Sequence, residues 1–189
     1  AINVATGNPN FKSDGGVVFT NNGKELVVYP CGKGSSTLGY DLYTYEVPAT
    51  VEKIRPCAFA HVEGFTSVKM SSPLKEIGED AFNACRYLKT VTIPSTVNKI
   101  ADGAFSGSIK LTAINVESGN TTYSSADGVL YNAAQTELVS YPAGKQGPYT
   151  TLPTTKTIRT RAFYYAAGIT KLTLTPGVEE IGNDAFQQT

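Results

Sequence analysis

The hexapeptide Ile-x-x-x-Ala-Phe recurs five times in this chain of 189 residues. Its isoleucines stand at positions 54, 77, 100, 158 and 181, so the copies keep a step of 23 residues except for one jump of 58. A period in the low twenties is typical of a solenoid, in which each unit buries its apolar edge against its neighbours. The repeat therefore predicts an architecture. It says much less about function, because solenoids bind through exposed side chains that share no signature.

Each repeat contains a predicted strand and a predicted turn. In the unit that begins at Leu88, Val91-Thr92-Ile93 alternates apolar and polar residues, as a half-buried strand does. Pro94 cannot donate to a sheet and should close this strand. Ala-Phe, followed three residues later by a small residue, predicts a short helical turn with its Phe pointing inward. The acids just before these turns are expected to act as N-caps: Asp80, Asp102 and Asp184.

Equivalent strands, stacked in parallel about 4.8 Å apart, predict one continuous ribbon. Its expected members are Ile2–Val4, Tyr45–Val47, Val68–Met70, Val91–Ile93, Ile114–Val116, Thr150–Leu152 and Leu172–Leu174. The solvent-facing row of the ribbon, expected to be concave, is Asn3, Glu46, Lys69, Thr92, Asn115, Thr151 and Thr173. This row is mixed and mostly small, which argues against a strongly charged ligand. A deep pocket for a small molecule is not expected, because side chains fill the interior of a solenoid.

A second level of repetition explains the jump of 58 residues. Ile2-Asn3-Val4 matches Ile114-Asn115-Val116, and the match continues through two apolar runs that flank Asn21-Asn22-Gly23 in the first copy. Asn-Gly between such runs is a strong hairpin signal. Two units, about 2–47 and 114–152, are therefore predicted to replace the helical turn by a β-hairpin. The 23-residue units then occupy about 47–114 and 152–189.

We expect residues 1–189 to form a single solenoid segment. Solenoids need polar caps at their ends, and neither end of this sequence looks like one. The segment is therefore interpreted as an excerpt of a longer array, from a mature or trimmed chain.

The composition argues against several classes of function. Sixteen basic residues balance sixteen acidic ones, so no electrostatic footprint for nucleic acid is present. No apolar run approaches the roughly 20 residues that span a bilayer, so no membrane insertion by this segment is expected. Cys31, Cys57 and Cys85 differ in their place in the repeat, and buried free thiols are favoured over a disulfide framework. With no Cys-x-x-Cys and a single histidine, neither a metal site nor a cofactor is expected.

The pattern Leu-x-x-Val-x-Ile-Pro-x-x-Val-x-x-Ile-x-x-x-Ala-Phe-x-x-Cys closely resembles the BspA-type leucine-rich repeats. The segment 123–131 resembles an insertion that recurs in the same family. The resemblance covers nearly the whole chain and implies an α/β solenoid: a leucine-rich-repeat right-handed arc with a parallel β-ribbon, short helical turns and two inserted β-hairpins. It also implies a secreted or cell-surface protein of anaerobic bacteria. Some members of the family are linked to adhesion to host proteins or to other cells.

One feature departs from the usual leucine-rich repeat. The asparagine expected three residues after the last apolar residue of each strand is absent. That slot holds Thr50, Pro73, Thr96, Thr155 and Gly177. Because buried backbone groups need partners, groups other than an asparagine ladder must supply them.

Three further features are assigned ordinary structural roles. His61 lies two residues after Phe59, with no nucleophile or orienting acid indicated by spacing, so a partly exposed histidine is expected. Asp14-Gly15-Gly16 and Asp127-Gly128 look like fragments of calcium loops, but they lack the alternating carboxylates and are interpreted as turns. Asn120 begins a glycosylation sequon and is interpreted as a loop asparagine.

The tyrosines are the strongest candidates for binding. Tyr40, Tyr43 and Tyr45 cluster in a seven-residue extension of the first hairpin unit, and Tyr164-Tyr165 follow the fourth Ala-Phe. Exposed tyrosine is favoured at interfaces with proteins and glycans. For the first group, binding and packing are equally supported, whereas packing is expected for the others.

The leading hypothesis is a non-catalytic binding or adhesion module, extracellular or at the cell surface and monomeric. Its partner would be a host or cell-surface protein or a glycan. The candidate binding residues are Tyr40, Tyr43, Tyr45, Glu46, Lys69, Thr92, Asn115, Thr151 and Thr173. The alternative is a structural spacer or stalk without a ligand of its own. An enzyme would need a clustered acid, base or nucleophile, which the spacing does not supply.

Overall fold

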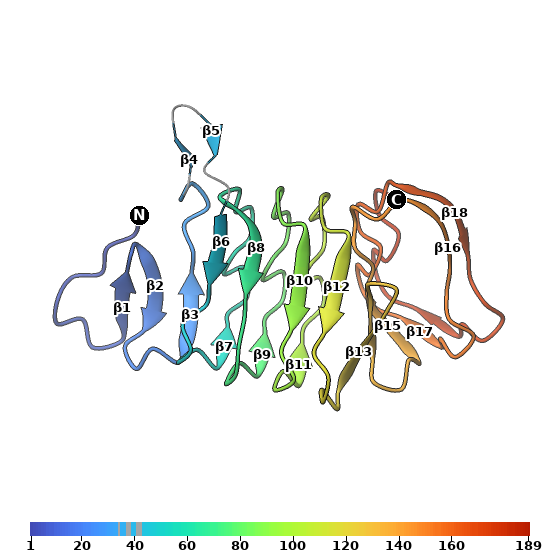
Figure 1. Cartoon of the computed structure of the whole chain (residues 1–189), viewed down its shortest axis with the longest axis horizontal. Helices are drawn as coiled ribbons and strands as arrows, with labels where there is room; N and C mark the ends of the chain where they lie inside the picture. Colours follow the sequence, from blue (N-terminus) through green and yellow to red (C-terminus); the bar gives the residue numbers. More distant parts are fainter. Residues whose placement is uncertain (34, 37–38, 41–42) are drawn as a thin grey trace.

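The structure is a computed structural model that describes residues 1–33, 35–36, 39–40 and 43–189. The chain winds as a β-solenoid along its long axis, with its two hairpin units at the beginning and past the middle (Figure 1). None of the described residues forms a helix, so the predicted α/β class is wrong in its helical part.

The first ribbon contains the strands that the alternating pattern predicts. Its longer part is a parallel sheet in the order β12-β10-β8-β6, side by side in Figure 1. These strands are β6 (Tyr43–Glu46), β8 (Phe65–Lys69), β10 (Thr90–Ile93) and β12 (Ala113–Val116). A separate pair, β16 (Gly147–Thr150) and β18 (Ile169–Thr173), continues beyond the second hairpin unit. The prediction of one continuous ribbon is therefore wrong, and Ile2–Val4 forms no strand.

Register follows the prediction among β6, β8, β10 and β12 but differs in the pair of β16 and β18. Glu46 lies opposite Lys69, and Thr92 lies opposite Asn115. In the second pair, however, Thr150 lies opposite Thr173, and Thr151 is only 2% exposed. Because successive residues of a strand point to opposite faces, a shift of one residue turns Thr151 inward. The prediction that Thr151 faces solvent is wrong.

The motif isoleucines form a second ribbon that the sequence pattern does not predict. The strands are β3 (Glu25–Val28), β7 (Lys53–Ile54), β9 (Glu76–Ile77) and β11 (Lys99–Ile100), with β15 (Glu137–Ser140), β17 (Thr157–Ile158) and β19 (Glu180–Ile181) after the break. On each side of the break, neighbouring motif isoleucines lie opposite one another, as Ile54 does with Ile77. Two-residue strands carry too little alternation to be recognised in sequence.

Both predicted hairpins are present, and each has one strand more than predicted. In the first, β1 (Phe11–Asp14), β2 (Val17–Thr20) and β3 form an antiparallel meander that passes into the second ribbon. In the second, β13 (Tyr123–Ala126), β14 (Val129–Asn132) and β15 do the same. The Asp-Gly sequences are turns, with Asp127 and Gly128 both at positive φ. A short pair, β4 (Ser35–Ser36) with β5 (Gly39–Tyr40), follows the first meander.

The Ala-Phe segments form a third edge, here called the turn ladder, in place of the predicted helical turns. The N–H groups of Cys57, Phe59 and His61 donate to carbonyls of the next unit, at 2.9, 2.8 and 2.8 Å. The residues between them donate three residues back along the chain, as Ala58 does to Arg55. Because alternate donors are used between units, a continuous helical pattern cannot form. Residues in the left-handed region recur four apart in each copy: Cys57 and His61, Asp80 and Ala84, Gly103 and Gly107, Arg161 and Tyr165, Asp184 and Gln188.

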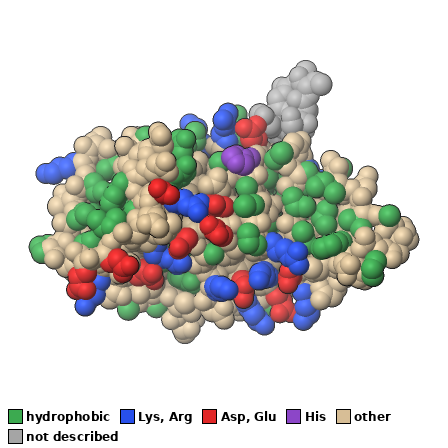
Figure 2. Space-filling model, turned by 180° about the vertical axis from the view of Figure 1, so that it is seen from behind, with side chains coloured by type: hydrophobic (Ala, Val, Ile, Leu, Met, Phe, Trp, Pro, Cys, Tyr) green, Lys and Arg blue, Asp and Glu red, His purple; other side chains and the backbone are tan. Residues whose placement is uncertain are grey.

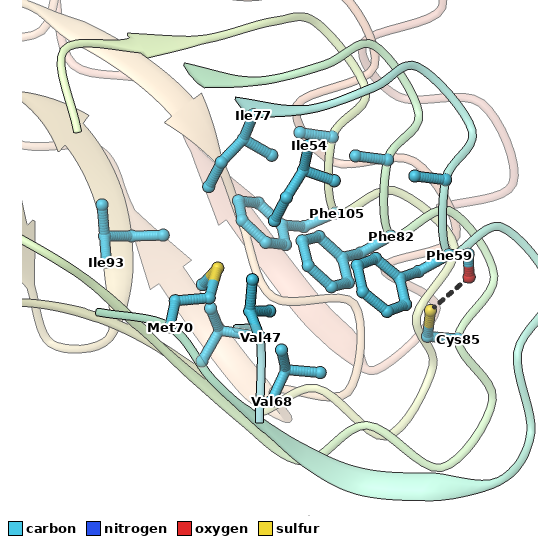
Figure 3. Packing of buried hydrophobic residues seen from close by; sticks show 14 of the residues in the cluster. Val47, Ile54, Phe59, Val68, Met70, Ile77, Phe82, Cys85, Ile93 and Phe105 are labelled. Carbon is cyan, nitrogen blue, oxygen red and sulfur yellow. Dashed lines mark hydrogen bonds between the residues drawn. The ribbon is translucent and has the colours of Figure 1, made fainter. Parts of the chain in front are cut away.

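The inward phenylalanines stack along the axis, as predicted for the core. Phe59 and Phe82 lie 4.8 Å apart and nearly parallel, and Phe82 and Phe105 lie 5.5 Å apart (Figure 3). In two units the small polar residue three positions after the Phe closes the turn. The thiol of Cys85 donates to the Phe59 carbonyl at 3.1 Å, and the hydroxyl of Ser108 donates to the Phe82 carbonyl at 2.8 Å.

The hydrogen bonds that an asparagine ladder would make to backbone carbonyls are made here by threonines and by one asparagine. Thr96 donates to the Leu74 carbonyl at 2.7 Å, and Thr50 donates to the Gly23 carbonyl at 3.1 Å. The Asn120 amide donates to two carbonyls of the preceding unit, those of Pro94 and Val97, at 2.9 Å each. The expectation that other groups replace the ladder is confirmed at these positions, and Asn120 is a structural residue.

Candidate binding groove at the bend

The second hairpin unit acts as a wedge between two stacks of coils. The ribbons on its two sides are separate sheets, and the Ile100 N–H donates to the Tyr123 hydroxyl at 2.7 Å instead of to a strand. The core divides here too, into one cluster before the wedge and another centred on Tyr131, Tyr141 and Phe163. The turn ladder nevertheless continues, because Gly107 N–H donates to the Tyr164 carbonyl at 3.4 Å. The solenoid therefore bends with its turn ladder on the inside.

Two arginines brace this bend. Arg161 contacts both carboxylate oxygens of Asp80 at 2.6 Å and Glu79 at 2.9 Å, although about eighty residues separate them. Arg159 contacts Asp102 at 2.7 Å. Hydrogen bonding to Asp80 raises the pKa of Arg161. Asp80 and Asp102 are thus partners of arginines. The prediction that they and Asp184 cap helices is wrong, because no helix follows them.

A groove of about 340 Å³ opens on the turn ladder beside this brace. Its walls come from three turns on one side of the wedge and one on the other. They are lined by His61, Glu63, Asn83, Ala84, Arg86, Gly107, Ile109, Tyr164 and Tyr165. Figure 2 shows the corresponding face, with the single histidine in purple among hydrophobic and charged side chains.

Two of the groove's side chains are large, apolar and exposed. Ile109 is 45% exposed and Tyr165 is 42% exposed. The rings of Tyr164 and Tyr165 meet edge to face, with centroids 4.8 Å apart. Opposite charges lie on the same wall, where Arg86 and Glu63 are 3.5 Å apart. The groove therefore combines an aromatic surface with polar groups of balanced charge.

The repeat does not require the bulky residues of the groove. The left-handed turn position that Tyr165 occupies holds His61, Ala84, Gly107 and Gln188 in the other units. In every unit but the last, the ladder fixes the backbone there, for example through the bond from Tyr165 N–H to the Gln187 carbonyl at 3.0 Å. The side chains at this position are thus free to vary. Only folding brings His61 and Tyr165, singled out separately in the sequence, to one site.

Two members of the predicted tyrosine cluster, Tyr43 and Tyr45, do not line the groove and contact other aromatic side chains. Tyr45 is half-buried, with its ring centroid 4.8 Å from that of Tyr29 and 5.6 Å from that of Phe59. Burial raises the pKa of its hydroxyl. The Tyr43 hydroxyl forms a hydrogen bond with the Tyr29 hydroxyl. The side chain of Tyr40 lies outside the described residues. Packing therefore accounts for Tyr43 and Tyr45.

The exposed row of the first ribbon is distinct from the groove. Glu46 and Lys69 form an ion pair of 3.0 Å across adjacent strands. Thr92, Asn115 and Thr173 are exposed, and none of the row lines the groove. The row is a mild polar surface, and its member Glu46 lines a small hollow of about 210 Å³ beside the first hairpin unit.

The cysteines differ in exposure. Cys85 is buried, and burial raises the pKa of its thiol. Cys31 and Cys57 are exposed free thiols, so the prediction of buried thiols is wrong for these two. In the part of the chain that the structure describes, no group of three or more His, Cys, Asp or Glu could hold a metal ion. The described residues also include no helix able to cross a membrane.

Two other hollows are less suited to a ligand. One of about 530 Å³ is lined by Arg159, Asp102 and Glu137, among others, and these charges already pair with one another. The other, of about 430 Å³, is a largely aliphatic surface of the first hairpin unit that includes Ile2 and Val18. Ile2 is 40% exposed, whereas Ile114, which matches it in the second hairpin unit, is buried. The hollow is therefore the side of the first hairpin unit that no neighbouring unit covers within the described residues.

Comparison with known proteins identifies the family. The sequence pattern of the BspA type leucine-rich repeat region matches residues 39–144 and 148–189, in six copies. The chain belongs to the BspA-type leucine-rich repeat family. Among curated protein sequences, none matches it.

Solved structures similar to this BspA-type chain come from bacteria. The pneumococcal vaccine antigen PcpA is 31% identical, with a TM-score of 0.71 over 78% of this chain and 37% of its own. A leucine-rich repeat protein from Eubacterium ventriosum is 24% identical, with a TM-score of 0.67 over 98% of this chain and 62% of its own. A leucine-rich cell surface protein from Faecalibacterium prausnitzii is 18% identical, with a TM-score of 0.55 over 94% and 65%. The latter two show the fold alone, and this chain spans less than two thirds of each of these structures.

Proposed function

We propose that this BspA-type segment is a non-catalytic binding module of a secreted or cell-surface bacterial protein, recognising a protein or a glycan through its repeat surface. The observation that carries the proposal is the groove at the bend. There two bulky side chains, Ile109 and Tyr165, are exposed in one groove although they come from units far apart in sequence.

The physical reason is the cost of exposing such side chains. Large apolar groups in contact with water gain free energy when a partner covers them, and exposed tyrosine is favoured at binding surfaces. The similarity to a vaccine antigen supports an extracellular location. The family is one of generally non-enzymatic repeat proteins, which supports binding in preference to catalysis.

The test is a binding screen of the soluble segment against host matrix proteins and a glycan array. We expect saturable binding that Tyr165→Ala combined with Arg86→Ala abolishes, with the melting temperature nearly unchanged. A matched variant, Thr92→Ala combined with Asn115→Ala, alters the exposed row of the first ribbon and should bind normally.

The result can also favour the other candidate surface or the alternative function. Loss of binding in the Thr92 and Asn115 variant alone would move the site to the first ribbon. Absence of binding to every protein and glycan would contradict the proposal and favour a structural spacer.

A further inference from the structure

We infer that the groove at the bend takes an uncharged sugar residue of a glycan, stacked on the ring of Tyr165. This inference rests on the proposed binding function and specifies its ligand. The chemistry that recognises such a ligand is an exposed aromatic face beside closely spaced polar groups without net charge. The groove supplies both.

The aromatic part of the site is Tyr165 with its neighbour. A sugar ring presents an apolar face of C–H groups, which covers an aromatic ring and removes apolar area from water. The Tyr165 ring is available for such contact because it is 42% exposed and its edge-to-face partner, Tyr164, supports one side. Tyrosine also loses little conformational entropy on binding, since it has only two rotatable side-chain bonds.

The polar part of the site suits hydroxyl groups. His61, Asn83, Arg86 and Glu63 line the groove and together offer donors and acceptors. A hydroxyl both donates and accepts, so it can bond to any of them. Arg86 and Glu63 already lie 3.5 Å apart, and among the described residues no other acidic or basic side chain except His61 lines the groove. A charged ligand would compete with this pair, whereas an uncharged one leaves it intact.

The size and rigidity of the groove fit a small terminal unit. Its volume of about 340 Å³ lies at the lower end of small-molecule sites. A stable protein interface covers about 800 Å² on each partner, much more than such a hollow provides. Its walls are held by bonds between units, such as His61 N–H to the Asn83 carbonyl at 2.8 Å and Ala84 N–H to the Ser106 carbonyl at 2.9 Å. A site fixed in advance loses little free energy to ordering when it binds.

The test uses the segment on a glycan array that carries neutral, sialylated and sulfated glycans, with the matrix protein panel run in parallel. Tyr165→Ala should weaken binding to neutral glycans by about tenfold or more, as expected for a lost aromatic contact. Tyr165→Phe keeps the ring and should retain most of the binding. Ala84→Tyr should also weaken binding, because it fills the groove. This variant should fold, since the same turn position holds His61 and Tyr165 in other units.

Each outcome decides one claim. Binding to neutral glycans that is lost in Tyr165→Ala and Ala84→Tyr, but kept in Tyr165→Phe and Thr92→Ala, supports the inference. Binding only to sialylated or sulfated glycans overturns the inference. Binding to neutral glycans that the groove substitutions do not reduce overturns it as well. Binding to a matrix protein and to no glycan overturns the inference and leaves the proposed function standing. Binding to nothing overturns both.

Discussion

Phe59, Phe82 and Phe105 meet ring on ring because each unit brings its phenylalanine to the same point of the coil. All three are fully buried between the two ribbons (Figure 3). In the hairpin units a tyrosine takes this place, so Tyr29 contacts Phe59, and Tyr141 contacts Phe163. At the residue scale the fold thus depends on one aromatic ring per coil, and a missing ring leaves a cavity between two coils.

Phe82→Ala should therefore lower the free energy of unfolding by about 3–5 kcal/mol, as large-to-small substitutions in a core do. Thermal unfolding followed by circular dichroism measures the effect, and Tyr165→Ala serves as an exposed aromatic control with little change. Equal melting temperatures for the two variants would show that the stack does not hold the coils together.

The buried thiol of Cys85 offers a second test at this scale. Because burial raises its pKa, the reactive thiolate is scarce, whereas Cys31 and Cys57 are exposed. Iodoacetamide should label two cysteines of the folded chain and three in denaturant, as counted by mass spectrometry. Rapid labelling of Cys85 in the folded chain would contradict its place in the core.

The hydrogen bond of Cys85 should also be replaceable by a hydroxyl. Ser108 makes the equivalent bond one unit later, with its hydroxyl equally buried. Cys85→Ser should thus lower the free energy of unfolding less than Cys85→Val does. The valine variant leaves the Phe59 carbonyl without a hydrogen-bond partner, which destabilises the fold by about 1–3 kcal/mol. Chemical denaturation of the two variants compares them, and the reverse order would mean that packing outweighs this bond.

The second ribbon is the element whose outer face carries regular charge. Glu52 lies between Lys24 and Lys75, at 2.8 and 3.3 Å, and Glu76 lies 3.1 Å from Lys53. Hydrogen bonds from Lys24 and from Lys53 lower the pKa of Glu52 and of Glu76, respectively. Ion pairs between neighbouring coils therefore follow the ribbon, although each is exposed to solvent and individually weak.

These pKa shifts predict a direction for the effect of acid. A carboxyl whose pKa is lower in the folded state contributes stability that is complete above its unfolded pKa, about 4.3, and is lost as the pH falls through the folded value. The melting temperature should drop below about pH 4, and less steeply in the Glu52→Gln, Glu76→Gln double variant than in the parent chain. Melting curves between neutral pH and pH 3 test this, and parallel curves would contradict it.

At the scale of the whole molecule, the bend is held by ion pairs across the turn ladder. The second hairpin unit separates the two stacks on the ribbon side (Figure 1), and Arg159 and Arg161 join them on the other side. The side chains of Arg161 and Asp80 are 23% and 22% exposed. This ion pair should therefore contribute more to stability than an exposed pair and less than a buried one.

Arg161→Ala should lower the free energy of unfolding by about 1–2 kcal/mol, between the values for exposed and buried ion pairs. It should also loosen the bend. Small-angle scattering of Arg159→Ala combined with Arg161→Ala measures the second effect as an increase in the largest dimension. Asp80→Ala combined with Arg161→Ala completes a double-mutant cycle. Additive costs in that cycle would show that the two residues do not interact.

Much of the architecture is determined by the sequence alone. Apolar residues at a fixed period must be buried against the neighbouring units, which specifies the core phenylalanines, the strands of the first ribbon and the hairpins. The same argument correctly predicts that groups other than an asparagine ladder satisfy the backbone, as Thr50 and Thr96 do. These features are local or repeat at a constant interval, so each copy supports the interpretation of the others.

The tertiary structure decided what depends on contacts between different units. Ala-Phe turns are not helical because Cys57 and its equivalents donate to the next coil, a partner that no local pattern reveals. Thr151 turns inward because register is set by pairing across strands. The groove itself arises only where the wedge brings Tyr165 to the same edge as His61, about a hundred residues away. Its one sequence signal was Tyr164-Tyr165 at turn positions that hold smaller residues in most other units, since exposed positions are not constrained by the repeat.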